Sequence, residues 1–133
     1  MARPSQIGSV EFAVQRLGVR LVVVLGHTRC GAVEAKLEHL RSSEPDASQN
    51  LLANVEPIQL SVERLLATEL THDTDSLMRD AVRANVRGCA DRLRYGSRIL
   101  AESIARDQFM VVGAEYSLES GTVDFFDGLQ VSV

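Results

Sequence analysis

The residues of this sequence best suited to carry chemistry are a histidine and a cysteine three positions apart, His27 and Cys30. They follow an apolar run from Leu21 to Leu25, and helical spacing of apolar residues resumes at Gly31. An imidazole and a thiolate on a sharp strand-to-helix turn are ligand types that zinc accepts. The spacing therefore predicts half of a metal site, and the other half must be sought elsewhere.

The stretch from Gly26 to Gly31 also resembles, superficially, the strand–loop–helix motif of a nucleotide-binding protein. It lacks the Gly-Lys-Ser/Thr ending of a phosphate-binding loop, and no other segment supplies a partner for magnesium. We therefore discard a nucleotide site.

Composition excludes several function classes. The chain has 133 residues, of which 45% are hydrophobic, so residues 1–133 are expected to form a single domain with a real core. The net charge of −4 argues against a nucleic-acid or anionic-membrane binder. The longest apolar run, Leu21 to Leu25, falls far short of the roughly 18 residues that a membrane span needs.

The two cysteines and the N-terminus predict a cytoplasmic location. Residues 1–6 contain one arginine but no apolar stretch typical of a signal peptide. Two cysteines without such a signal fit a reducing compartment, where thiols serve as ligands or core atoms.

Apolar residues at helical spacing predict a series of helices. Ser5 and Ser97 are expected as N-caps, and Gly18 is expected in the left-handed conformation that ends a helix. A capping turn is expected at 71–74. The predicted helices cover 6–17, 31–40, 51–55, 57–66, 78–95 and 97–104.

Few strands accompany these helices. Residues 19–25 are apolar on both faces, which is typical of a strand inside a parallel sheet. Residues 109–112 form a second buried-type strand, and 115–118 and 122–126 flank a turn at 119–121. The pattern predicts an α/β fold with a mostly parallel β-sheet flanked by helices.

So narrow a sheet would leave the apolar strand at 19–25 with an unpaired edge. Either strands are missing from this chain or a second copy covers that edge. We therefore expect a homodimer or a higher oligomer.

Four segments, in order, resemble the β-class carbonic anhydrases. His27-Thr-Arg-Cys-Gly31 is similar to their second zinc motif, His-x-x-Cys-Gly, and Ile7–Val14 is similar to the helix before it. Ala81–Arg87 resembles their long later helix, and Val111–Phe125 resembles their closing strand, turn and return strand. The resemblance thus covers almost the whole chain.

The sequence departs from this family at its start. Members begin with a strand ending in Cys-x-Asp-x-Arg and a second strand ending near Arg-Asn-Ala-Gly, and the sequence opens at Met1 just downstream of both. The fold expected is therefore the family's α/β domain, truncated at its N-terminus, without its first two strands. The family's Asp–Arg dyad is absent, so the catalytic residues are unknown.

The resemblance implies a zinc ion held by two cysteines and one histidine, with water or an aspartate in the fourth position. Such zinc lowers the pKa of bound water to about 7, and the hydroxide attacks carbon dioxide to give bicarbonate. Only His27 and Cys30 carry over as metal ligands. Gly31 matches the small residue beside the cysteine, where the backbone passes close to the site.

Three functions remain open. The first is a β-carbonic anhydrase-type zinc lyase, weak or inactive in this chain alone, whose remaining ligands come from another polypeptide segment or from solvent. The second is a catalytically dead member that acts in oligomeric assembly or partner binding, with His27 and Cys30 as remnants of a metal site. The third is hydrolysis of a related substrate such as carbonyl sulfide. A bare Cys30 at a helix N-terminus would have a lowered pKa and oxidise readily.

Two copies are not expected to share one zinc through pairing of the strand at 19–25. In an antiparallel pair the two carboxyl ends lie at opposite ends of the ladder. Seven residues at ~3.3 Å each separate them by roughly 20 Å, too far for one ion.

The remaining candidates are better explained by structure. Cys89, Asp91 and Arg92 imitate Cys-x-Asp-x-Arg with the arginine one place early, and Cys89 lies on an apolar helical stripe, so core packing is expected. His39 is expected near a helix C-terminus, and His72 in a capping turn.

Tyr116 and Phe125-Phe126 are expected in sheet and interface packing. Five arginines at helical spacing predict a solvated face rather than an anion-binding patch; they are Arg79, Arg83, Arg87, Arg92 and Arg94.

Overall fold

The computed structural model describes residues 3–41 and 74–129. Its helices and strands are, in chain order, α1 (Pro4–Leu17), β1 (Leu21–His27), α2 (Gly31–Arg41), α5 (Thr74–Tyr95), α6 (Arg98–Ala105), β2 (Met110–Tyr116) and β3 (Val123–Asp127). The helices predicted at 51–55 and 57–66, and most of the predicted turn at 71–74, lie outside the described residues. No helix in the described part is long and apolar enough to cross a membrane.

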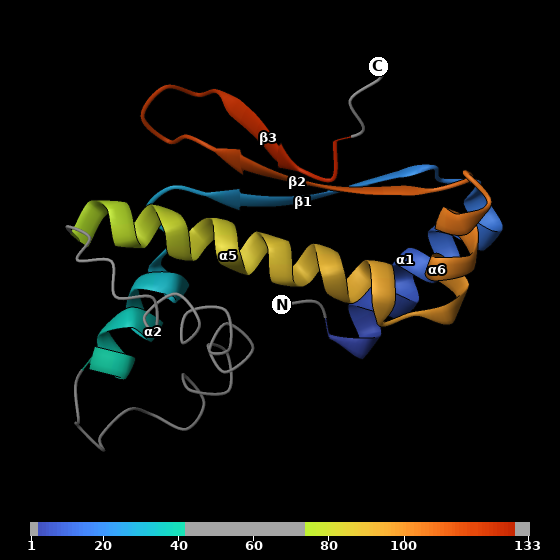
Figure 1. The fold of residues 1–133 in the computed structure, drawn as a ribbon, viewed down its shortest axis with the longest axis horizontal. Helices are drawn as coiled ribbons and strands as arrows, with labels where there is room; N and C mark the ends of the chain where they lie inside the picture. Colours follow the sequence, from blue (N-terminus) through green and yellow to red (C-terminus); the bar gives the residue numbers. More distant parts are fainter. Residues whose placement is uncertain (1–2, 42–73, 130–133) are drawn as a thin grey trace.

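The three strands form one mixed sheet in the order β1-β2-β3 (Figure 1). Strands β1 and β2 are parallel, with Leu21 opposite Met110 and His27 opposite Tyr116, whereas β2 and β3 are antiparallel. This confirms the predicted α/β class. The strand predicted at 115–118 is wrong, because Met110–Tyr116 is one continuous strand through Gly113. A Cβ at Gly113 would lie 2.9 Å from Val86 of α5, so the glycine allows helix and strand to approach.

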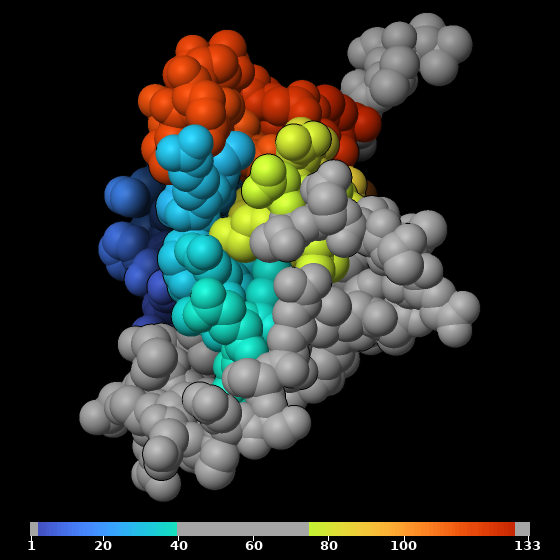
Figure 2. All heavy atoms as spheres, turned by 90° about the vertical axis from the view of Figure 1, so that its left-hand side faces the viewer, coloured from blue at the N-terminus to red at the C-terminus, as the bar shows by residue number. Residues whose placement is uncertain are grey.

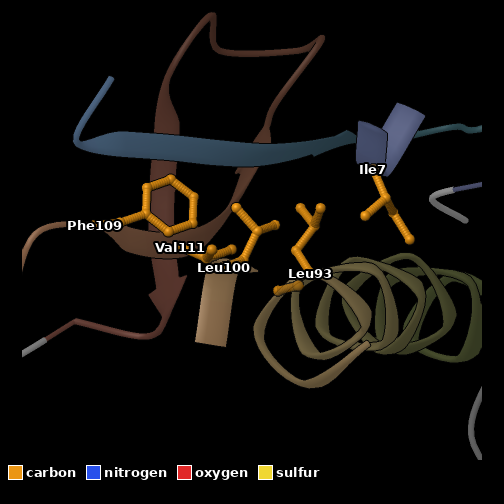
Figure 3. Close-up of a cluster of buried hydrophobic side chains, with 6 residues drawn as sticks. Ile7, Leu93, Leu100, Phe109 and Val111 are labelled. Carbon is orange, nitrogen blue, oxygen red and sulfur yellow. The ribbon is translucent and has the colours of Figure 1, made fainter. Parts of the chain in front are cut away.

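Helix α5 runs along one face of the sheet, with α1 and α6 packed towards its right-hand end in Figure 1. We call this the helix face. Its main core cluster, most of which Figure 3 labels, combines side chains from α1, α5, α6 and β2. The buried members are Ile7, Ala90, Leu93, Leu100, Phe109 and Val111.

The opposite face of the sheet, which we call the open face, exposes large apolar side chains. Val22 and Val24 of β1 pack against the core cluster, so strand alternation directs Leu21, Val23 and Leu25 to the open face. Their exposed fractions are 49%, 40% and 56%. The prediction of a strand buried on both faces is therefore wrong for the described residues, whereas the predicted unpaired edge is present there, since β1 pairs only with β2.

Helix ends follow the predicted chemistry with one correction. Ser97 accepts a hydrogen bond from the Leu100 amide at 3.2 Å and caps α6, and Gly18 ends α1 with φ 69°. Helix α1 begins earlier than predicted, at Pro4, and the capping residue is Arg3 instead of Ser5. Proline is favoured in a first turn because its missing N–H needs no partner there.

The predicted solvated arginine face is wrong for two of its members. Arg83 pairs with Asp124 at 2.7 Å and with Glu115 at 3.3 Å, and Arg94 pairs with Asp127 at 2.8 Å. The helical spacing did not reveal these pairs because their acidic partners lie on β2 and β3, which cross α5 in space.

Candidate metal centre

The two predicted ligands flank the turn that connects β1 to α2. His27 is the last residue of β1, and the Cys30 carbonyl accepts the first helical hydrogen bond, from Glu34, at 3.0 Å. Cys30 therefore occupies the N-cap position of α2. Its side chain is half-buried against the cluster of Val33 and Leu37, whereas His27 is exposed. The predicted placement of the thiol at a helix N-terminus is confirmed.

The His27 ring is oriented by the backbone of the next residue, Thr28. Nδ1 lies 2.8 Å from the carbonyl oxygen of Thr28. Because a carbonyl oxygen only accepts hydrogen bonds, Nδ1 must carry the proton and donate it. In a neutral imidazole Nε2 then holds the free lone pair, which is the arrangement that metal-ligating histidines adopt.

These two residues fit as part of a zinc site and do not complete one. Imidazole nitrogen and thiolate sulfur suit zinc, but zinc sites in proteins take at least three protein ligands. The described residues contain no cluster of three or more His, Cys, Asp or Glu able to hold a metal ion.

The turn itself is fixed by a network that sequence reasoning missed, and that we call the turn brace: Thr28, Arg29, Ser117, Leu118 and Glu119. The Thr28 hydroxyl donates to Glu119 Oε2 at 2.9 Å and accepts from the Leu118 amide at 3.0 Å. Arg29, at φ 54°, forms an ion pair with Glu119 Oε1 at 2.8 Å. The Ser117 hydroxyl donates to Glu119 Oε2 at 3.1 Å. The hydrogen bond from Thr28 is the main reason why the pKa of Glu119 lies below its usual value.

Figure 2 shows the same region from the end of the molecule: the orange β2–β3 turn lies against the light-blue end of β1, beside the yellow-green start of α5. A cleft of about 640 Å³ is lined by residues from all three, among them Arg29, Arg79 and Glu119.

Arg83 and Glu115 also line this cleft. Glu115 is only 6% exposed; its Oε1 lies 3.3 Å from Arg83, and its Oε2 has no hydrogen-bond partner among the described residues. Desolvation lowers the pKa of Arg83, but hydrogen bonds and charge from Asp124 and Glu115 outweigh it and raise the pKa overall. The guanidinium of Arg83 thus remains charged.

The two glycines beside the motif, Gly26 and Gly31, differ in how closely other residues approach them. A Cβ at Gly31 would meet no heavy atom of the described residues within 4 Å. At Gly26, one residue before His27, it would lie 2.6 Å from Cγ2 of Val86. Of these two glycines, Gly26 is the one at which packing against the described residues leaves no room for a side chain.

The other sequence candidates do not gather at this turn. Cys89 is half-buried on α5, roughly two helical turns after Val82, with Asp91 and Arg92 exposed beyond it. A displaced Cys-x-Asp-x-Arg motif would need a strand end, so packing remains the better explanation of Cys89. His39 lies near the end of α2, as predicted, and His72 lies outside the described residues.

Comparisons with known proteins agree with the resemblance. A family model described as carbonic anhydrase matches residues 2–123. A carbonic anhydrase of Mycolicibacterium smegmatis is 33% identical over 120 residues, which cover 89% of this chain and 54% of that protein. The chain thus spans about half the length of the curated relatives it matches.

Solved structures agree in fold. The β-carbonic anhydrase CafA of Aspergillus fumigatus superposes with a TM-score of 0.81 at 26% identity, covering 98% of this chain and 59% of its own. A structure of tetrameric β-carbonic anhydrases from Sordaria macrospora superposes with a TM-score of 0.73 at 21% identity, covering 95% and 63%. A helix-backed mixed sheet with a histidine–cysteine turn at a strand end defines the class, and the chain belongs to the β-carbonic anhydrase family.

Proposed function

We propose that the protein is a β-carbonic anhydrase-type zinc protein whose family reaction is the reversible hydration of carbon dioxide to bicarbonate. The observation that carries this proposal is the His27–Cys30 turn, with Nδ1 of His27 held by the Thr28 carbonyl and Nε2 left to bind a metal. His27 and Cys30 would hold the zinc ion, and zinc bound there supplies an acidified water. The further ligands come from another polypeptide segment or from solvent, so activity of this chain alone is weak or absent.

Metal analysis and carbon dioxide hydration by the purified 133-residue chain test this proposal. We expect zinc to bind and to be lost in both His27→Ala and Cys30→Ser. Cys89→Ser is the matched control, because that thiol lies on α5 away from the turn. Zinc that stays bound in both ligand variants would contradict the assignment. Carbonyl sulfide offered in parallel would distinguish the hydrolase alternative.

A second candidate, assembly or partner binding without catalysis, is favoured by the open face. Leu21, Val23 and Leu25 expose apolar surface along a strand that pairs on one side only in the described part of the chain. Such edges are normally paired or covered. The solved relative from Sordaria macrospora is described as tetrameric. We propose that this chain forms a homodimer or a larger oligomer through β1.

Light scattering tests the oligomer. A mass above that of one chain at micromolar concentration is expected, and a stable monomer would contradict the proposal. Zinc-dependent hydration at rates typical of the family would exclude the purely assembling, inactive member. We also propose a cytoplasmic location, supported by the two free thiols of Cys30 and Cys89; cell fractionation tests it.

A further inference from the structure

Two turns that lie far apart in the sequence meet beside the proposed metal ligands. Thr28 and Glu119 are 91 positions apart, yet their side chains are 2.9 Å apart. Glu119 belongs to the β2–β3 turn, which reaches past the end of β2 to the turn between β1 and α2. Neither ligand, His27 or Cys30, touches Glu119 in a contact that the structure records, so any effect must pass through the two residues between them.

Thr28 is held at three points. Its amide donates to the Tyr116 carbonyl at 3.0 Å, its hydroxyl donates to Glu119, and the same hydroxyl accepts from the Leu118 amide at 3.0 Å. The carbonyl of this immobilised residue is the acceptor for Nδ1 of His27. The direction of the His27 ring therefore depends on where the brace holds Thr28.

Arg29 is held by the same carboxylate. Its backbone has a φ of 54°, the left-handed region that residues with a side chain seldom occupy. Its guanidinium Nε lies 2.8 Å from Glu119 Oε1. Because Arg29 immediately precedes Cys30, its conformation sets the direction in which the chain enters α2 and presents the thiol.

We propose that Glu119 is a positioning residue for the metal-ligand turn, fixing Thr28 and Arg29 so that Nε2 of His27 and Sγ of Cys30 can bind the same ion. The inference rests on the proposed zinc function. Outer-shell groups that orient a metal-ligating histidine contribute to metal affinity although they never touch the metal. Glu119 lies one residue further from the metal than such outer-shell groups, because it acts on the ligands through the Thr28 hydroxyl and the Arg29 guanidinium.

A merely structural Glu119 is the competing explanation, because it also accepts from Ser117 within its own turn. The two roles differ in which measurable property changes when Glu119 is replaced. A hairpin-stabilising residue changes the unfolding temperature and leaves the His27 tautomer alone. A positioning residue shifts the tautomer of the folded protein.

The test compares Glu119→Ala with Thr122→Val, which removes a contact of the same hairpin, to Ser120 at 2.7 Å, without touching Thr28. Nitrogen NMR of the His27 ring in the metal-free chain reports the tautomer, and competition with a chelator reports zinc affinity. We expect Glu119→Ala to mix the tautomers and to weaken zinc binding about tenfold or more. Thr122→Val should leave both unchanged.

A second pair guards against a variant that fails to fold. Thr28→Ser keeps the hydroxyl and should behave like the unmodified chain, whereas Thr28→Val should behave like Glu119→Ala. Unchanged tautomer and affinity in folded Glu119→Ala or Thr28→Val would overturn the inference. If the unmodified chain binds no zinc, the proposed metal function fails, while the tautomer comparison alone still supports or overturns the positioning role.

Discussion

The two faces of the sheet differ in how completely they are closed. On the helix face, Leu100 is fully buried and Phe109 nearly so, and the acidic residues of β2 and β3 meet arginines from α5. On the open face, Leu25 of β1 and Phe125 of β3 are about half exposed. One face is a finished domain core, and the other has the composition of an interface.

This difference shows how the chain can have the family's fold while its described residues hold no complete metal site. The helix face carries the contacts that hold β1, and so fix His27 at its end. In the described part of the chain, the edge of β1 away from β2 is unpaired, and its open face carries exposed apolar side chains. The described residues thus form a closed hydrophobic core on the helix face without also forming a complete metal site.

The largest loss of stability is expected from truncating a buried side chain on the helix face. Leu100→Ala removes a side chain with no exposed surface and should lower the free energy of unfolding by about 2–5 kcal/mol. Leu25→Ala on the open face should cost much less in a monomer, and any cost should grow with protein concentration because it reflects association. Denaturant titrations at two concentrations measure both. Equal costs for the two variants would erase the distinction between the faces.

A smaller loss is expected where strand and helix approach most closely. In Gly26→Ala the new Cβ would lie 2.6 Å from Val86 Cγ2, and a β-branched side chain on a helix cannot rotate away. Overpacking of this kind costs about 1–3 kcal/mol. Gly31→Ala, on the other side of the ligand turn, meets open space and should leave thermal stability nearly unchanged. A loss at Gly31 equal to that at Gly26 would contradict the packing argument.

The buried carboxylate of Glu115 offers a third test. Arg83→Met removes its partner and should cost about 1–3 kcal/mol by leaving a buried acceptor unpaired. Adding Glu115→Met should recover much of that loss, since an ion pair replaced by apolar groups is often neutral. Arg79→Met, one helical turn earlier and exposed, is the control. A double variant no more stable than Arg83→Met would show that the pair is not a unit.

The smallest effect is a pH dependence of the turn brace. The pKa of Glu119 is lowered in the folded chain. The ionised carboxylate therefore stabilises the folded turn fully above the usual glutamate value of 4.5, and this stabilisation is lost as pH falls through the lowered pKa. The NMR chemical shifts of the Thr28 and Leu118 amides should therefore change with pH in the acid range. Glu119→Gln should abolish that transition, and a transition that survives would assign it to another group.

Local sequence patterns predicted most of the helices and strands. They could not predict contacts between residues that lie far apart in the sequence. Helical spacing placed α2 and α6, the hydroxyl of Ser97 marked a cap, and the His27–Cys30 spacing located the ligand turn. Nothing near Thr28 indicates Glu119, because the two are brought together only when β1 and β2 pair. For the same reason the partners of Arg83 were missed. Apolar runs likewise fail to distinguish a strand buried on both faces from one with an apolar open face.

The pairing of β1 with β2 also governs how the chain reaches its folded state. Leu21 finds its partner Met110 only 89 positions further along the chain. Contacts between such distant residues slow folding, because a long loop must close before any hydrogen bond of the ladder forms. Strand β1 leaves the ribosome well before its partner and has to wait with its apolar side chains uncovered. Aggregation therefore competes with folding mainly during this interval, and β1 is the segment through which chains would associate wrongly.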